Sequence, residues 1–195
     1  MNRTEDLKFT EVKVNMLSAI NDSWNEIRPM LKKHTVFART NLLRQGEISA
    51  HIFFVVSGAL RLYYIDDDGR DISFQFFFEE QLVSSFESFY LETESKFSIE
   101  SIEDSEILSL DKETFQMLSD KYPDIKDLVT KFACNRFIDY TNIFLSYLKN
   151  SPEERYIELL KSKPEILKRV PQHYIASYLG ITPVSLSRIR KRIGN

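Results

Sequence analysis

Basic and hydroxyl side chains are concentrated between residues 182 and 192. Lysine and arginine neutralise phosphates, while serine and arginine form hydrogen bonds with base edges in the major groove of DNA. We therefore expect this segment to contact DNA, with Ser185 and Arg188 nearest the bases and Lys191 on the backbone. The candidate DNA-binding residues are Thr182, Ser185, Ser187, Arg188, Arg190, Lys191, Arg192 and, upstream, His173.

Two short helices joined by a tight turn must position these side chains. Pro171 suits a first helical turn, and Gly180 suits the stop, because glycine takes a left-handed backbone without steric cost. Thr182 and Pro183 then fit an N-cap and first position of a second helix. This arrangement predicts a helix-turn-helix. The alternative is an ordinary helical hairpin whose basic face is only solvated.

Charge is distributed unevenly along the chain. The 195 residues carry a net charge of −3, but residues 150–195 hold nine Lys and Arg against four acidic residues, a charge of +5. The first 149 residues therefore carry −8. Such asymmetry indicates two functions in one chain, with the basic end facing phosphate.

Composition argues against several other classes of protein. Cys134 is the single cysteine, so the sequence predicts no disulfide and no cysteine-ligated metal. His34, His51 and His173 are isolated, and the metal sites of cupin-type enzymes need paired histidines, so we expect no metal, no cofactor and no enzyme activity. No stretch resembles a membrane span or a signal peptide, and we expect a cytoplasmic, membrane-free protein.

Alternating apolar residues from 36 to 110 predict a set of short strands. Segments 52–56, 60–64, 72–78, 97–102 and 106–110 are short and rich in apolar residues, with clear alternation in 60–64, and Asp66 to Gly69 suits a hairpin turn. This pattern predicts a jelly-roll β-barrel within an α+β fold. Helical periodicity predicts helices at 16–33, 111–120 and 123–148.

The helix expected from Pro123 to Leu148 has many aromatic and aliphatic residues. A copy of the same helix in a homodimer would cover them, and we favour this reading over packing on the chain's own barrel. The candidate dimer-interface residues are Leu128, Phe132, Phe137, Tyr140, Phe144 and Leu148. The expected domains are 1–120 (N-terminal helix and barrel), 121–149 (dimerisation helix) and 150–195 (helix-turn-helix).

In this order of elements, the sequence resembles the Crp/Fnr family of bacterial transcription regulators. Residues 42–72, with Gly46, Glu47, Gly58 and Gly69, and the helix-turn-helix carry the resemblance. It implies a cyclic-nucleotide-binding-like barrel, a dimerisation helix and a DNA-binding domain that regulates transcription, with RNA polymerase as a possible partner. In this family a wing usually follows the recognition helix, and we expect none here.

The family's phosphate cassette, a Gly-Glu pair followed by an Arg-Ser or Arg-Thr pair, is altered. Ser84-Ser85 and Ser95-Lys96 stand at the matching positions, so the arginine clamp is lost. We expect neither cyclic AMP nor cyclic GMP to bind in the usual way. The pocket is either filled by its own Phe side chains or adapted to an unknown effector, with candidate residues Ser84, Ser85, Glu87, Ser95 and Lys96.

The leading hypothesis is therefore a homodimeric, sequence-specific regulator that binds double-stranded DNA. The alternative is a nucleotide- or small-molecule-binding module that acts on a protein partner, and the basic C-terminal segment argues against it. The effector, the operator and the sign of regulation are left open.

Overall fold

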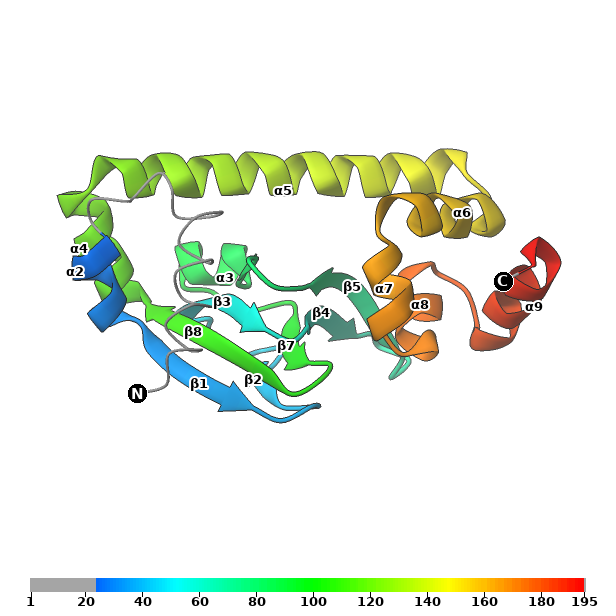
Figure 1. Cartoon of the computed structure of the whole chain (residues 1–195), viewed down its shortest axis with the longest axis horizontal. Coiled ribbons are helices and arrows are strands. Elements are labelled where there is room, and N and C mark those ends of the chain that lie inside the picture. Colours follow the sequence, from blue (N-terminus) through cyan, green and yellow to red (C-terminus); the bar gives the residue numbers. More distant parts are fainter. Residues whose placement is uncertain (1–23, 195) are drawn as a thin grey trace.

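The computed structural model describes residues 24–194 of the chain. Two sheets lie beneath a long helix, and a group of shorter helices lies beneath the far end of that helix (Figure 1). Within the described range, no helix combines the length and the apolar character that crossing a membrane requires.

The strands among the described residues form two antiparallel sheets. The strands are β1 (Lys32–Val36), β2 (Asn41–Leu43), β3 (His51–Ser57), β4 (Leu60–Ile65), β5 (Asp71–Phe77), β6 (Leu82–Val83), β7 (Ser98–Ser101) and β8 (Ser105–Asp111). The sheet orders are β1-β8-β3-β6 and β2-β7-β4-β5. The five predicted segments correspond to β3, β4, β5, β7 and β8, so the strand prediction is confirmed there.

Apolar side chains from both sheets meet in one core. Val55 of β3 and Ile107 of β8 come from the first sheet, and Leu60 of β4 and Ile99 of β7 come from the second; all four are fully buried. The two sheets therefore form a sandwich whose interior is filled by its own side chains. At one end, Gly69, with φ of +78°, closes the turn between β4 and β5.

The N-terminal helix predicted for residues 16–33 can be compared with the structure only from Trp24 onward. Residues 16–23 of that prediction lie outside the described residues, and α2 (Trp24–Ile27) with η2 (Arg28–Met30) forms its helical remainder. Lys32 and Lys33 belong to β1, so the helix prediction is wrong for them. They pair with Ser109 and Leu108 of β8, and this long-range pairing overrides the local helical pattern.

The remaining helices among the described residues are α3 (Phe86–Leu91), α4 (Lys112–Lys121), α5 (Pro123–Lys149), α6 (Pro152–Ser162), α7 (Pro164–Arg169), α8 (Gln172–Tyr178) and α9 (Pro183–Ile193). As predicted, Asp111 caps α4 by accepting a hydrogen bond from the Thr114 amide at 2.8 Å. Ser151 and Glu154 form a capping box at the start of α6, which separates that helix from α5.

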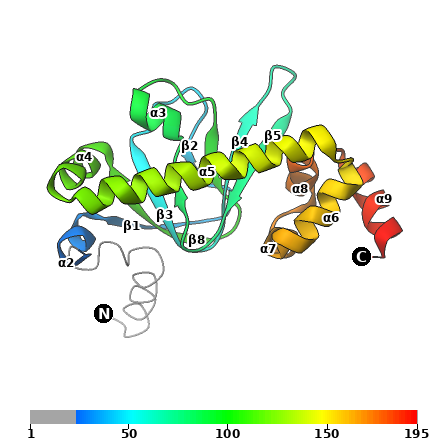
Figure 2. The same cartoon turned by 90° about the horizontal axis from the view of Figure 1, so that it is seen from above.

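The 27-residue helix α5 links the sandwich to the C-terminal helices (Figure 2). One side of it packs on the sandwich: the Tyr140 ring lies 5.2 Å from that of Phe74, and the Arg136 guanidinium lies 4.9 Å from the Phe77 ring. At its far end, α6 to α9 share a core with the outer face of β4 and β5, which includes Phe76, Ile175 and Leu186.

Candidate functional site

Helices α8 and α9 are joined by a turn that depends on Gly180. This residue has φ of +67°, a conformation that glycine adopts without strain. A Cβ atom at this position would lie 3.1 Å from Cε1 of Tyr147 on α5, so a side chain here would also require the Tyr147 ring to move by a few tenths of an ångström. Thr182 then caps α9, because its Oγ1 accepts a hydrogen bond from the Ser185 amide at 3.1 Å.

The two sides of α9 have different environments. Leu186 and Ile189 are buried in the C-terminal core, while Ser187, Arg188 and Lys191 are exposed. The structure thus brings Ser187, Arg188 and Lys191 to one accessible face of α9.

Three of the predicted residues have a more restricted position. Arg192 forms an ion pair with Glu153 of α6, and the Ser185 hydroxyl lies 3.0 Å from Thr182 Oγ1, within the cap. Arg190 is half-buried. His173 is exposed on α8, with its ring against that of Tyr174.

Sequence reasoning missed Val184, which is 61% exposed in the first turn of α9. An apolar side chain at this place suits contact with a thymine methyl group. The sequence could have indicated this exposure, because Val184 falls outside the apolar stripe of Leu186, Ile189 and Ile193 that packs into the core.

Arg61 of β4 holds α8 against the sandwich and was also missed. Arg61 is only 1% exposed. Its guanidinium lies between the Tyr63 ring at 3.9 Å and the Tyr174 ring at 3.6 Å. It donates hydrogen bonds to Asp71 at 2.7 Å and Glu100 at 3.3 Å. Burial alone would lower the pKa of Arg61, but these two carboxylates outweigh burial and raise it. An arginine within an otherwise apolar strand was the sequence signal for this buried contact.

Two further contacts join the C-terminal helices to the sandwich. Arg169 of α7 donates to Glu79 at 2.7 Å and also pairs with Glu103. Burial would raise the pKa of Glu79, but the hydrogen bonds and charge of Arg169, together with hydrogen bonds from the backbone amides of Gly58 and Glu79, outweigh burial and lower that pKa. The Ser177 hydroxyl accepts from the Ser73 amide at 2.7 Å. The orientation of α8 and α9 is therefore set by the outer face of β4 and β5.

The candidate effector residues separate into two groups. Ser85 and Ser95 are buried and hydrogen-bonded to each other at 2.7 Å, and Ser84 donates to the His51 carbonyl at 3.1 Å. Lys96 and Glu87 form an exposed ion pair at 3.0 Å. The groups that would meet a nucleotide phosphate thus satisfy one another, and the pairing between Lys96 and Glu87 lies at the surface.

The candidate dimer residues fall on two faces of α5. Phe137, Phe144 and Leu148 are 72%, 63% and 66% exposed. In contrast, Leu128, Phe132 and Tyr140 are half-buried against the chain's own sandwich and α3, so placing all six residues on one stripe was wrong. The 3.6-residue period leaves room for two apolar faces on one helix, and the prediction combined them. Ile138 and Leu145 join the exposed stripe.

Metal chemistry has no support within residues 24–194. No group of three or more His, Cys, Asp or Glu in this range is arranged to bind a metal ion. His34 forms a hydrogen bond through Nε2 with the Ser109 hydroxyl at 2.8 Å, and His51 stacks on Phe53.

Comparisons with known proteins agree with this architecture. Residues 34–122 match the cyclic nucleotide-binding domain family. No curated protein sequence is similar enough to the chain to count as a relative.

Solved structures that resemble the chain include FixK2 from Bradyrhizobium japonicum, with a TM-score of 0.73, 16% identity and 84% of each chain covered. CLP from Xanthomonas campestris has a TM-score of 0.74 at 18% identity, covering 89% of this chain and 91% of its own. A putative crp/fnr regulator from Eubacterium rectale has a TM-score of 0.70 at 19% identity, with 88% and 86% covered. Residues 34–122 therefore match the cyclic nucleotide-binding domain family, and the chain shares the fold of these solved structures, one of which is described as a crp/fnr family member.

Proposed function

We propose that the chain is a homodimeric, sequence-specific DNA-binding regulator of transcription, in which α8 and α9 form a helix-turn-helix. The observation that carries this proposal is the exposed polar and basic face of α9, held by a capped start and a buried apolar side. In this proposal residues 1–120, 121–149 and 150–195 serve as sensor-type domain, dimerisation helix and DNA-binding domain.

Several residues of α9 and its cap have distinct proposed roles. Arg188 reads a base edge, since arginine pairs with guanine through two hydrogen bonds. Lys191 and Arg190 contact phosphates, and Val184 lies against a thymine methyl group. Thr182 and the N-terminus of α9 lie near a phosphate, where the positive end of the helix dipole favours an anion.

The exposed stripe on α5 supports the dimer. Phe137, Phe144 and Leu148, with Ile138 and Leu145, form an apolar strip on the side of α5 that does not contact the sandwich. Large exposed apolar patches mark interaction surfaces. A second copy of α5 is the partner we propose, because a two-fold pair gives two copies of α9 for two half-sites.

The effector domain is proposed to work without cyclic AMP or cyclic GMP. The direct hydrogen bond between Ser85 and Ser95 supports this proposal, since both hydroxyls already have partners. The interior core of the sandwich, which includes Phe53 and Phe77, supports it further.

The roles on α9 are tested by salt titration of DNA binding. Arg188→Ala should cost about 1–3 kcal/mol on a selected site and relax the preference at one base pair per half-site. Lys191→Ala should weaken binding to all sequences alike and reduce the salt slope by about one per subunit. Lys168→Ala, an exposed lysine on α7, is the charge-matched control and should change neither. Equal behaviour of all three variants would contradict the assignment.

A further inference from the structure

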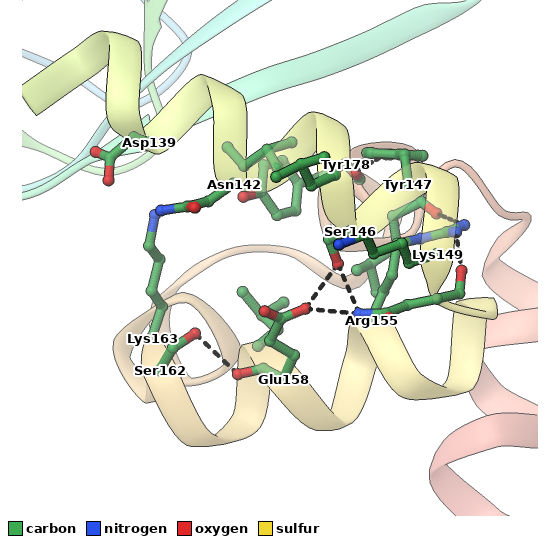
Figure 3. A pocket seen from close by; sticks show the side chains of 15 residues that line it. Asp139, Asn142, Ser146, Tyr147, Lys149, Arg155, Glu158, Ser162, Lys163 and Tyr178 are labelled. Carbon is green, nitrogen blue, oxygen red and sulfur yellow. Dashed lines mark hydrogen bonds between the residues drawn. The ribbon is translucent and has the colours of Figure 1, made fainter.

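A cleft of about 410 Å³ lies between the last turns of α5 and the first of the C-terminal helices (Figure 3). Its walls come from Asn142 and Ser146 of α5 and from Glu158 and Ser162 of α6, and Lys163 lies at its edge. This size is within the range of small-molecule sites. The cleft lies on a different side of α5 from the exposed residues Phe137, Phe144 and Leu148. Leu145 is the one residue that belongs to both the cleft and the exposed stripe. A dimer formed through that stripe therefore leaves the cleft open.

The interior of the cleft is mainly apolar. Ile143, Leu159 and Tyr178 contribute to its lining, together with the Tyr147 ring. Burial raises the pKa of Tyr178 to about 12, so its hydroxyl stays protonated at neutral pH. This lining suits a hydrocarbon or aromatic group.

Most charged groups around the cleft already have partners. Glu158 accepts hydrogen bonds from Ser146 at 2.6 Å and from the Asn150 amide at 3.2 Å. Arg155 donates to the carbonyls of Asn150 and Leu179 at 2.8 and 2.9 Å. Its Nε–H group is buried and has no partner in the described part of the chain. Asp139, the other acidic residue of the lining, pairs with Arg136 at 3.8 Å. Both carboxylates thus have partners, while the Nε–H group of Arg155 does not.

Lys163 and Asn142 have side chains without a hydrogen-bond or ion-pair partner among residues 24–194. Figure 3 shows Lys163 extending from the end of α6 across the opening toward Asn142 on α5. An ammonium and an amide that meet across an opening form a binding site for an anionic group. Apart from the carbonyl oxygen of Asn142, the unused polar groups of these side chains and of Arg155 are therefore donors: the Lys163 ammonium, the Asn142 NH₂ group and the Arg155 Nε–H.

We propose that this cleft binds a small organic anion, with its carboxylate or phosphate at Lys163 and Asn142 and its apolar body on Ile143, Leu159 and Tyr178. Because α5 forms one wall and α6 the other, the bound anion fixes the angle between the long helix and the C-terminal helices. If the chain binds DNA as proposed above, such a ligand regulates the spacing of the two α9 helices. This consequence rests on the proposed function. Binding itself does not depend on that function.

The test is a titration of the full chain, without DNA, with hexanoate and with hexyl phosphate, followed by the side-chain amide NMR signals. At least one of the two anions should shift the Asn142 signal, and the shift should reach a plateau as its concentration rises. Hexanol, which has the same body and no charge, should bind at least about tenfold more weakly, the loss expected for a charge-assisted hydrogen bond. The anion that binds more tightly identifies the head group.

Lys163→Gln should weaken binding of the anion about tenfold, because it removes the charge and keeps most of the side-chain length. Lys168→Gln on α7 is the control and should bind as the wild type does. Both lysines are exposed, so both variants should keep the wild-type melting temperature. No saturable shift at Asn142, equal binding of hexanol, or equal effects of the two lysine variants would overturn the proposal. Because the titration contains no DNA, these results stay separate from a failure of DNA binding.

Discussion

Replacing Phe137 and Phe144 by glutamate should convert the protein from a dimer to a monomer. These rings are 72% and 63% exposed on α5, where they alternate with Cys134, Thr141 and Leu148 at the average 3.5-residue spacing of a helix pair. The substitution removes none of the described contacts between α5 and the sandwich, because other residues, such as Arg136 and Tyr140, make them. The variant should therefore stay folded while the interface is lost.

The size of the effect follows from the exposed area. A phenylalanine side chain buries about 150–250 Å² when fully covered, so each of these rings still has roughly 100–160 Å² to bury. At about 25 cal/mol per Å² this is about 3 kcal/mol for each ring, and roughly 12 kcal/mol as an upper limit for the four rings of a dimer. A micromolar dimer needs only about 8 kcal/mol in all. Loss of the rings, with four carboxylates brought together, removes more than that.

Light scattering coupled to gel filtration measures this directly. The wild type should have twice the 23.0 kDa chain mass at micromolar concentration, and the Phe137→Glu, Phe144→Glu variant should have the single mass. The matched control combines Lys131→Gln and Asn135→Glu, which changes the net charge equally on another, exposed side of α5. This control should remain a dimer. A monomeric wild type, or a double variant that stays dimeric, would refute the reasoning.

Two further predictions concern the sandwich. Arg61→Met removes the cation between Asp71 and Glu100, and loss of one partner of a buried ion pair costs about 3–5 kcal/mol. Urea unfolding should report this loss, and a change below about 1 kcal/mol would contradict the structural role of Arg61. Cyclic AMP and cyclic GMP should give no measurable heat in titration calorimetry, because Ser85 and Ser95 bond to each other and no arginine is present at the cassette. A micromolar dissociation constant for either nucleotide would contradict this.

Much of the fold follows from local patterns in the sequence. The limits of α9 are those of the prediction, from Pro183 to Ile193, because a Thr cap and a first-turn proline mark the start unambiguously. The strands near residues 52–110 were also evident, since alternation of apolar residues reports burial on one face. These signals lie within a few residues of the structure they predict.

The features that were missed depend on contacts far along the chain. β1 forms because Lys32 and Lys33 meet β8, about 75 residues away, and no local pattern reports that pairing. The exposed and packed faces of α5 were merged, because periodicity locates apolar residues without saying what covers them. Arg61 reaches Tyr174 across more than a hundred residues, so its role becomes visible only when α8 lies on β4.

Selection from random DNA duplexes by the full-length wild-type protein tests the central claim most directly. Two α9 helices related by a two-fold axis should enrich a nearly palindromic motif whose half-sites are separated by about one turn of DNA, ~34 Å. The Arg188→Ala variant, selected in parallel, should lose the preference at one position in each half-site. An absence of any enriched motif, or a single half-site without its symmetric copy, would contradict the proposed dimeric, sequence-specific regulator.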